Sequence, residues 1–323
     1  MKILVVGGAG YIGSICAEIL IDERHQVAIF DNLIEGHRGA IDSRSWFFEG
    51  DLSDGRAIGQ ALHQFRPDAV MHFAASALVG ESMENPSKYF RNNVANGLNL
   101  LDAMVAAGID KLIFSSTCAI FGPPDRVPID ETLPMRPINP YGESKLMFEK
   151  VLRWYHDIHG LEFVSLRYFN AAGASENFGE DHRTETHLIP NMLKVALGQK
   201  PCVDIYGTDY DTPDGTCIRD YIHIIDLARA HILALDATRS DFYNLGTGGG
   251  SSVREVIETG RKITGHKIPV QEKPRRPGDP PRLIASSDKI KRELGWKPRY
   301  QALEAILESA WKWHQKFPNG YPD

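Results

Sequence analysis

The first half of the chain alternates short, almost wholly apolar runs with longer amphipathic runs. Because the short runs are apolar at nearly every position, they indicate strands that are covered on both faces. Strands and helices that alternate at this spacing predict a doubly wound parallel sheet with helices on both faces. The predicted strands are residues 3–6, 26–30, 46–49, 69–73, 112–115 and 163–168, and the predicted helices are residues 12–21, 55–65, 86–107 and 142–159.

The pattern changes after about residue 170. Glycine, proline and aspartate become frequent there, notably in residues 206–220 and 273–282, and the predicted helices are shorter. We therefore predict two α/β domains, one over residues 1–170 and a smaller C-terminal lobe over residues 171–323. The apolar segments 224–235 and 242–245 are expected to return to the first domain.

Composition and charge narrow the class of protein. The 323 residues, with 42% hydrophobic and 24% charged side chains, are typical of a folded globular protein with room for two packed lobes. The formal net charge of −6 argues against binding to nucleic acid or to an anionic membrane, and no apolar run approaches the roughly 18 to 20 residues that span a bilayer. The four cysteines form no CxxC pair, so we expect a reduced, cytoplasmic protein without a disulfide framework.

A glycine-rich turn directly follows the first predicted strand and opens the first helix. Gly7, Gly10 and Gly13 have the spacing G-x-x-G-x-x-G and enclose Tyr11 and Ile12. Such a turn lets the backbone approach a pyrophosphate, and the helix N-terminus offers its free N–H groups to the phosphates. A purely structural turn is the alternative. The strand–turn–helix context favours dinucleotide binding on a Rossmann-type sheet.

Further candidate cofactor residues follow at the carboxyl ends of the next strands, where a dinucleotide would lie. Asp31 ends the second strand, and a carboxylate there accepts hydrogen bonds from both ribose hydroxyls of the adenosine and repels a 2′-phosphate. This favours NAD over NADP, with a capping or surface role as the alternative. Asp51 is placed to meet the adenine edge, and the small residues Ala74 and Ala75 after Phe73 leave room for the cofactor backbone.

A tyrosine and a lysine four positions apart begin the last helix of the first domain. Tyr141 and Lys145 share one helix face, so the ammonium group of Lys145 can favour the phenolate of Tyr141. Lowering a tyrosine pKa from ~10 to about 7 needs ~4 kcal/mol, which we expect from this lysine and the positive nicotinamide of an oxidised cofactor. Ser115 and Thr117 end the preceding strand, and the Thr117 hydroxyl is expected to bridge substrate and tyrosine. A chance surface pair is the alternative.

These segments resemble a known family. Residues 7–13, 115–117 and 141–145 are similar to the extended short-chain dehydrogenase/reductase superfamily. The resemblance narrows to the UDP-glucose 4-epimerase family across essentially the whole chain, through residues 72–75 (HFAA), 79–82 (VGES), 92–94 (NNV) and, most specifically, 167–174 (RYFNAAGA) and 214–223 (DGTCIRDYIH).

The resemblance implies an NAD cofactor, a UDP-sugar substrate and a homodimer. In this family the NAD contacts match Tyr11, Ile12, Asp31, Asn32, Asp51, Leu52, Phe73, Ala74, Asn92, Tyr141, Lys145 and Phe169. The substrate contacts match Thr117, Tyr141, Asn170, Leu188, Tyr206, Arg219, Arg276 and Asp279.

Four positions depart from the family pattern. Ala77 replaces a lysine that often lies near the cofactor, and Thr117 replaces a frequent serine while keeping the hydroxyl. His187 stands where an asparagine commonly meets the pyrophosphate. Leu283 occupies the position of the gate to the sugar pocket, which bears on the choice of sugar.

The reaction that the resemblance implies is a reversible inversion at C4 of a UDP-hexose, such as UDP-galactose or UDP-glucose. Tyr141 takes the C4 hydroxyl proton, the C4 hydride passes to NAD, and the 4-keto sugar turns its other face before hydride and proton return. A nucleotide-sugar 4,6-dehydratase or a decarboxylase is one alternative, but such enzymes need a carboxylate just after Thr117, where Cys118, Ala119 and Ile120 stand. A non-catalytic dinucleotide sensor is another, but such proteins usually lose the tyrosine or the lysine.

Other charged segments have simpler explanations beside a functional one. The residues of the basic segment 273–279 fit a solvated linker and an arginine clamp on a pyrophosphate equally well. The resemblance favours the clamp. It implies that Arg276 and Arg219 bind phosphate and that Asp279 binds the uridine ribose. The acidic residues in 209–220 depart from a calcium loop, and His156 and His159 lack a third ligand. We therefore expect no metal site.

Overall fold

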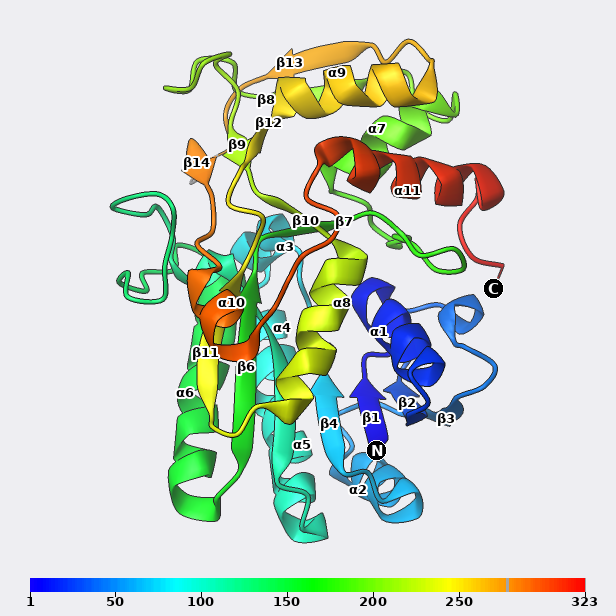
Figure 1. The fold of residues 1–323 in the computed structure, drawn as a ribbon, viewed down its shortest axis with the longest axis vertical. Coiled ribbons are helices and arrows are strands. Elements are labelled where there is room, and N and C mark those ends of the chain that lie inside the picture. The colour runs from blue at the N-terminus through cyan, green and yellow to red at the C-terminus, as the bar shows by residue number, and fades with distance from the viewer. Residues whose placement is uncertain (277–278, 323) are drawn as a thin grey trace.

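The centre of the molecule is a seven-stranded parallel sheet with the strand order β11-β6-β5-β4-β1-β2-β3 (Figure 1). The computed structural model describes residues 1–276 and 279–322. Because the order runs outward from β1 in one direction and from β4 in the other, the carboxyl ends of these two strands flank the switch point at which ligands bind in such sheets. The strands are β1 (Lys2–Val6), β2 (Gln26–Asp31), β3 (Trp46–Glu49), β4 (Ala69–His72), β5 (Lys111–Thr117), β6 (Glu162–Tyr168) and β11 (Asp241–Leu245).

Helices cover both faces of this sheet. The helices α1 (Tyr11–Asp22) and α8 (Ile224–Leu233) pack on one face, where Ile3 and Val5 belong to their hydrophobic core. Leu4 and Val6 point to the other face and belong to a second core with α2 (Gly55–Phe65), α5 (Asn96–Ala107) and α6 (Pro140–His159). Two covered faces explain why residues 3–6 of β1 are all apolar and buried, and they confirm the predicted Rossmann-type α/β class.

The predicted helix over residues 86–107 has the predicted ends, but its middle is π-helical instead of α-helical. The structure divides it into α4 (Pro86–Tyr89), a π-helical segment η2 (Phe90–Ala95) and α5, and it adds a helix α3 (Val79–Glu84) that was not predicted. The side chain of Asn93 donates to the Ser76 carbonyl and to Ser144 Oγ, both at 3.0 Å. Such π-helical turns occur inside α-helices, frequently at functional sites.

The smaller lobe lies beyond the carboxyl ends of the strands (Figure 1). Its hydrophobic core joins α7 (Leu188–Ala196), α9 (Val253–Thr264) and α11 (Leu303–Lys316) to a two-stranded parallel sheet of β8 (Val203–Tyr206) and β13 (Val270–Lys273). Short strand pairs connect this lobe to the main sheet. They are β7 (Asn170–Ala172) with β10 (Tyr221–His223), and β12 (Ser251–Ser252) with β9 (Ile218–Arg219) and β14 (Arg282–Leu283).

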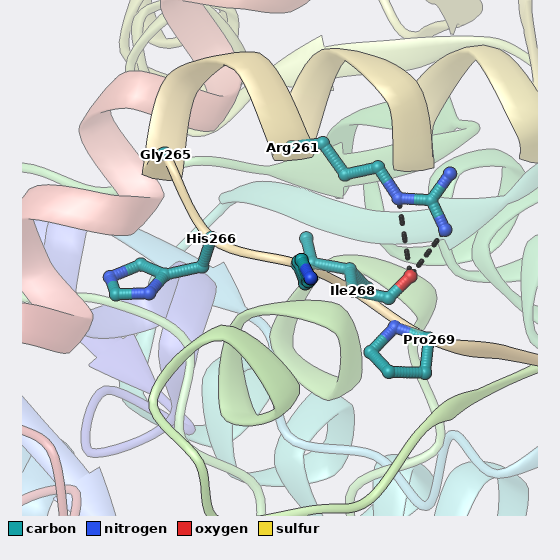
Figure 2. A pocket seen from close by; sticks show the side chains of 6 residues that line it. Arg261, Gly265, His266, Ile268 and Pro269 are labelled. Atoms are coloured by element: carbon teal, nitrogen blue, oxygen red, sulfur yellow. Dashed lines mark hydrogen bonds between the residues drawn. The ribbon is translucent and has the colours of Figure 1, made fainter.

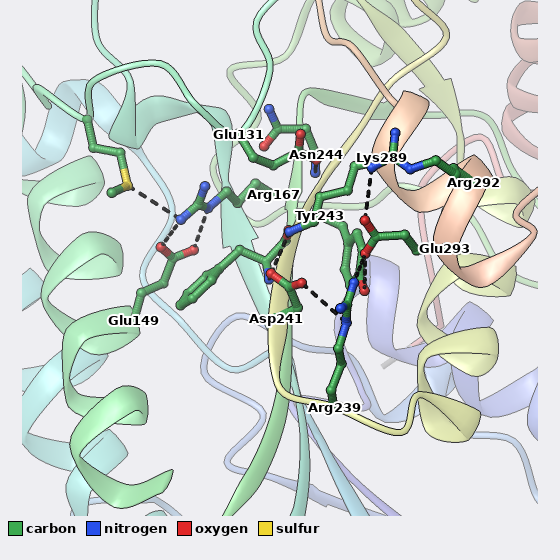
Figure 3. Close-up of polar contacts among 12 residues, drawn as sticks. Glu131, Glu149, Arg167, Arg239, Asp241, Tyr243, Asn244, Lys289, Arg292 and Glu293 are labelled. Carbon is green, nitrogen blue, oxygen red and sulfur yellow. Dashed lines mark hydrogen bonds and ion pairs between the residues drawn. The ribbon is translucent and has the colours of Figure 1, made fainter. Parts of the chain in front are cut away.

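After β10 the chain re-enters the sheet layer. The helix α8 packs against α1, and β11 pairs in parallel with β6 from Asp241 beside Val164 to Leu245 beside Tyr168. Beyond it, α10 (Asp288–Leu294) is held to this edge strand by an ion pair of Lys289 Nζ with Asp241 Oδ1 at 2.5 Å (Figure 3). Among the described residues, no helix combines the length and the apolar character needed to cross a membrane.

Candidate active site

The glycine turn joins β1 to α1 at the switch point of the sheet. Gly7 has a φ of +81°, and a Cβ atom there would lie 2.4 Å from the backbone nitrogen of Ala74. A Cβ on Gly13 would lie 2.3 Å from the Gly7 carbonyl oxygen, so both positions exclude every other residue. Gly10 is the N-cap of α1 without a side-chain cap, and the first turn carries no acidic residue. Its free N–H groups and positive dipole fit the pyrophosphate of a dinucleotide.

Asp31 connects the end of β2 to this turn. Its Oδ2 accepts a hydrogen bond from the Ala9 backbone N–H at 3.0 Å, and its Oδ1 accepts one from the Leu33 N–H at 2.8 Å. Burial raises the pKa of the Asp31 carboxyl, and these backbone hydrogen bonds oppose the rise. The residue therefore has a structural role in the turn, beside the predicted contact to a ribose.

The other predicted cofactor residues line the same edge of the sheet. Asn32 Nδ2 donates to Asp51 Oδ2 at 2.5 Å, directly beyond β2 and β3. Beyond β4, the N–H groups of Phe73 and Ala74 both donate to the Val6 carbonyl. Around them lie Tyr11, whose hydroxyl donates to the Gly173 carbonyl at 2.7 Å, Asn92, whose Nδ2 donates to Ser76 Oγ at 3.0 Å, and the buried side chains of Leu52 and Phe169.

The helix α6 places Tyr141 and Lys145 beside the end of β5. Its N-cap Asn139 accepts a hydrogen bond from the Gly142 N–H at 2.8 Å, and Pro140 occupies the first helical position. Lys145 is only 3% exposed, and its Nζ donates to the Ser115 carbonyl at 2.8 Å. Burial lowers the pKa of Lys145 to about 7, against the opposing charge of Glu149.

Tyr141 meets Thr117 at this edge. Burial raises the pKa of Tyr141 to about 12, and a hydrogen bond with the Thr117 side chain opposes the rise. The folded chain by itself therefore favours the neutral phenol. Lowering the pKa of Tyr141 to about 7 then takes more free energy than the ~4 kcal/mol expected for an exposed tyrosine. Ser115, the third predicted residue here, hydrogen-bonds through Oγ with the Tyr168 hydroxyl.

A buried carboxylate continues the same face of α6 and was not predicted. Glu149 lies one turn beyond Lys145, and Figure 3 shows it facing Arg167 of β6. Its Oε2 accepts from Arg167 Nη2 at 2.7 Å, and its Oε1 accepts from Arg167 Nε, Ser116 Oγ and Ser165 Oγ at 2.7 to 2.9 Å. The available signal in the sequence was an arginine inside an apolar strand together with a glutamate on the catalytic face of the helix.

The predicted substrate residues form two groups in the smaller lobe. In one, the guanidinium carbon of Arg276 lies 3.9 Å from the centre of the Tyr206 ring. In the other, Arg219 forms an ion pair with Asp279, and Leu283 pairs in register with Arg219 across β9 and β14. Pro277 and Gly278 of the same segment lie outside the described residues.

Besides Leu283, two more predicted substrate positions, Asn170 and Leu188, begin elements of the smaller lobe. Leu283 packs on a small hydrophobic cluster that Cys118 also contacts, which brings the predicted gate close to Thr117. Asn170 begins β7 and donates its backbone N–H to the Asp220 carbonyl at 3.0 Å. Leu188 begins α7, directly after the N-cap His187.

The imidazole of His187 is engaged by carboxylates instead of standing free. Its Nδ1 lies 3.0 Å from Oε1 of Glu180 and 3.0 Å from Oε1 of Glu185. Although burial opposes the charged form, these two carboxylates raise the pKa of His187 to about 10. A cationic imidazole suits the predicted contact to a pyrophosphate.

A separate hollow at the end of α9 contains none of the predicted site residues (Figure 2). There the Nε of Arg261 donates to the Ile268 carbonyl at 3.2 Å. The hollow is lined by Arg261, Gly265, His266, Lys267, Ile268 and Pro269.

The fold and the site indicate a dinucleotide-dependent α/β enzyme, and comparison with known proteins narrows the class. The sequence pattern of the NAD dependent epimerase/dehydratase family matches residues 3–246, and the chain belongs to this family. It is similar to the UDP-glucose 4-epimerase of Halalkalibacterium halodurans, with 50% identity over 99% of this chain and 98% of that protein.

Solved structures agree over the whole fold. The UDP-glucose 4-epimerase of Brucella ovis in complex with NAD has a TM-score of 0.93 and 46% identity, covering 96% of this chain and 97% of its own. The enzyme of Bifidobacterium longum in complex with NAD⁺ and UDP has a TM-score of 0.95 and 38% identity, covering 99% and 100%.

Proposed function

We propose that the chain is an NAD-dependent C4 epimerase of UDP-hexoses, with UDP-galactose and UDP-glucose as its substrate pair. The observation that carries the proposal is the placement of Tyr141, Lys145 and Thr117 at the carboxyl edge of the sheet that also holds the glycine turn. Relatives named UDP-glucose 4-epimerase, aligned over nearly the full chain, support the same activity.

In this proposal the chain moves a proton and holds the sugar. Tyr141 takes the proton of the C4 hydroxyl and returns it after inversion, while Thr117 hydrogen-bonds to the tyrosine oxygen. Lys145, fixed by the Ser115 carbonyl, brings positive charge toward the phenolate. Bound NAD supplies the hydride chemistry at C4.

The UDP portion must stay fixed while the 4-keto sugar turns its other face. We assign this anchoring to Arg219, Arg276, Tyr206 and His187, whose cationic or aromatic groups suit a uridine diphosphate. The ion pair between Arg219 and Asp279 opens to admit the phosphates and the ribose. Asn170, Leu188 and Leu283 border the sugar in the same proposal.

The NAD contacts are assigned to the sheet edge on the same grounds. The glycine turn holds the pyrophosphate and Asp31 the ribose, and the remaining contacts come from Asn32, Asp51, Leu52, Phe73, Ala74, Ala75, Asn92, Ser115 and Phe169. The corresponding division is an NAD-binding domain over residues 1–170 and a UDP-sugar-binding lobe over residues 171–323, with the segment around 220–248 shared with the first.

A lyase of the 4,6-dehydratase or decarboxylase type is not favoured. Such chemistry needs an additional acid or base near C5 or C6 of the sugar. The residues that follow Thr117 are Cys118, Ala119 and Ile120, none of which has a carboxylate. Burial raises the pKa of the Cys118 thiol to about 12, so it is not an acid–base group at neutral pH either.

We also propose that the protein is a cytoplasmic homodimer. The helix α6 exposes Met147, Trp154 and Ile158 on one face, with exposed fractions of 39%, 65% and 67%, and Val105 of α5 adds a further exposed apolar side chain. Apolar residues at this helical spacing favour burial against a second copy. The four cysteines are free thiols, which suits a reducing compartment.

The test is incubation of the purified protein with a panel of UDP-sugars, followed by chromatographic separation of the products. We expect interconversion of UDP-galactose and UDP-glucose. A stable 4-keto-6-deoxy product would establish a lyase instead, and the absence of turnover with every UDP-sugar would favour a dinucleotide sensor.

A further inference from the structure

Four metal-binding side chains meet in the connection between β7 and α7. Glu180, His182, Glu185 and His187 each present one ligand atom, and these four atoms all lie within 4.8 Å of one another. His187 Nδ1 lies 3.0 Å from Oε1 of each glutamate, and His182 Nε2 lies 3.3 Å from Oε1 of Glu180. These residues differ from the acidic residues of 209–220 and from His156 and His159, for which no metal site was expected.

The two carboxylates are buried, and one of their oxygens is unsatisfied. The side chains of Glu180 and Glu185 are 6% and 4% exposed. The Oε2 atom of Glu185 is buried and makes no hydrogen bond within the described residues. A buried polar atom without a partner costs about 1–3 kcal/mol. The histidines contact Oε1 of Glu180 and Oε1 of Glu185, but they do not contact Oε2 of Glu185.

The segment is held in place from several sides. The Gly179 N–H donates to the Tyr321 hydroxyl at 2.9 Å, and that hydroxyl donates to the Gly179 carbonyl at 3.1 Å. The ring of Tyr11 packs edge-on against His182, with centroids 6.2 Å apart. The His187 backbone N–H donates to Glu185 Oε1 at 2.7 Å. The four side chains therefore converge on a fixed framework, which is what a binding site requires.

We propose that Glu180, His182, Glu185 and His187 bind a divalent transition-metal ion, for which Zn²⁺ is the best match. Two imidazole nitrogens with two carboxylate oxygens suit zinc and its neighbours, whereas magnesium and calcium prefer oxygen ligands alone. Bonds of about 2.0–2.2 Å place the ligand atoms of a tetrahedral site about 3.4 Å apart, and the three measured contacts already lie at 3.0 to 3.3 Å. The wider separations, which reach at most 4.8 Å, must shorten when the ion binds.

Charge and access agree with the same ion. His182 and His187 bind a metal ion as neutral imidazoles, so the divalent cation replaces their protons as the charge that neutralises the two carboxylates in the cluster. The side chains of His182 and His187 are 32% and 46% exposed, so the ion can enter from solvent on the histidine side. The competing explanation is an ion-pair network without metal, which leaves Glu185 Oε2 without a partner.

The experiment uses the full-length protein after treatment with a chelator and removal of the chelator. Zn²⁺ is titrated in competition with a chromophoric chelator, and Co²⁺ is added separately to record its visible absorption. We expect one equivalent of Zn²⁺ and an intense cobalt spectrum typical of four-coordinate geometry. Excess Mg²⁺ should not displace either ion.

Two variants and a matched control identify the ligands. Glu185→Gln and His182→Gln should each weaken Zn²⁺ binding by at least about tenfold, whereas His63→Gln on the exposed surface of α2 should leave it unchanged. Circular dichroism verifies that each variant folds. His182→Gln provides the test if the buried Glu185 position does not tolerate the change, because its side chain is partly exposed.

Absence of stoichiometric binding, or equal binding by wild type and both variants, would overturn the proposal in favour of the metal-free ion-pair network. The measurement involves neither NAD nor a UDP-sugar. Its failure would therefore leave the proposed epimerase activity untouched, and a lack of epimerase activity would leave the metal site untouched.

Discussion

Tyr141 shows how far one residue depends on its surroundings. Its phenol is buried, its pKa is raised to about 12, and the hydrogen bond from Thr117 offsets only part of that rise. In the proposed mechanism positive charge must stabilise the phenolate, and Lys145 of the same helix is the group of the chain assigned to that role.

We expect Tyr141→Phe to keep the fold and NAD binding and to lose at least about 10²-fold in kcat, the usual scale for an acid–base group. Steady-state turnover of UDP-galactose measures the loss, and cofactor titration verifies that the site is intact. Tyr155→Phe is the matched control. Tyr155 lies near the other end of the same helix, and its hydroxyl hydrogen-bonds to Asp102 of α5. Turnover of Tyr141→Phe within a factor of about two of wild type would contradict the assigned role.

The size of Leu283 sets the second prediction. Leucine is smaller than tyrosine but larger than serine, and size discrimination in an apolar pocket is worth only ~1–3 kcal/mol. We expect a preference for UDP-galactose over UDP-N-acetylgalactosamine of about tenfold or more in kcat/KM. Leu283→Ser should narrow this ratio and Leu283→Tyr should widen it. Equal kcat/KM values for both sugars in the wild-type enzyme would falsify the assignment.

At the scale of elements, the helix α6 presents three polar side chains of the candidate site on one face. Tyr141, Lys145 and Glu149 follow one another at intervals of four residues, and the last is fixed by Arg167 of β6. Burial lowers the pKa of Lys145 to about 7, and the negative charge of Glu149 acts against this decrease. Glu149 is thus a positioning residue for the lysine.

We expect Glu149→Gln to lower the pKa of Lys145 further, because the stabilising negative charge is removed. A lower pKa means that Lys145 loses its proton at lower pH, so the alkaline limb of the kcat/KM profile should move to lower pH. Each unit of displacement lowers the protonated fraction about tenfold above the pKa. A pH profile that differs from wild type only in height would indicate a structural role.

The stability of this variant needs its own control. Removing one partner of a buried ion pair costs about 3–5 kcal/mol, since Arg167 would keep its charge without Glu149. The double variant Glu149→Gln with Arg167→Met removes both charges and should recover most of the free energy of unfolding. It should retain the displaced pH profile, which separates the electrostatic effect from the loss of stability.

Asp31 joins two elements, because its carboxylate at the end of β2 accepts a hydrogen bond from the glycine turn. Asp31→Ala should weaken NAD binding and reduce the discrimination against NADP, since the ribose acceptor and its repulsive charge are both lost. Asp31→Asn keeps an acceptor for the Ala9 N–H and should lose mainly the discrimination. Calorimetric titration of cofactor-stripped protein with both dinucleotides measures the two effects. Unchanged affinities would leave Asp31 with its structural role alone.

The elements that the sequence predicted well are those with a local pattern. The strand over residues 46–49 and the helix over residues 55–65 have the predicted ends, because the apolar pattern and the Asp54 N-cap are local features. The π-helical segment within residues 86–107 was not predictable, since Asn93 in this segment bonds to Ser76 and Ser144, which are distant in the sequence. Glu149 was missed for the same reason, because tertiary packing brings it to Arg167 of β6. The four residues of the Glu180–His187 cluster lie within eight positions of one another, but they belong to a connection without a regular period, so the sequence did not show that their side chains converge.

At the scale of the whole molecule, the candidate cofactor residues belong to the sheet edge and most of the candidate substrate residues to the smaller lobe. The helix α6 carries both the Tyr141–Lys145 pair and an exposed apolar face. Met147, Trp154 and Ile158 lie on the outer side of the helix whose inner side holds Lys145 and Glu149. Association through this face would brace the catalytic helix in each copy. The proposed dimer therefore concerns function as well as assembly.

We expect light scattering after size exclusion to give twice the chain mass of 36.0 kDa, that is about 72 kDa, for the wild type. Trp154→Glu places a charge on the apolar face and should shift the mass toward that of one chain, because burying an unpaired charge is unfavourable. Trp46→Glu is the matched control, since Trp46 is 60% exposed on β3 at the opposite end of the sheet. If the wild type runs as a monomer, or if the Trp46 variant dissociates as readily as the Trp154 variant, α6 is not the dimer interface.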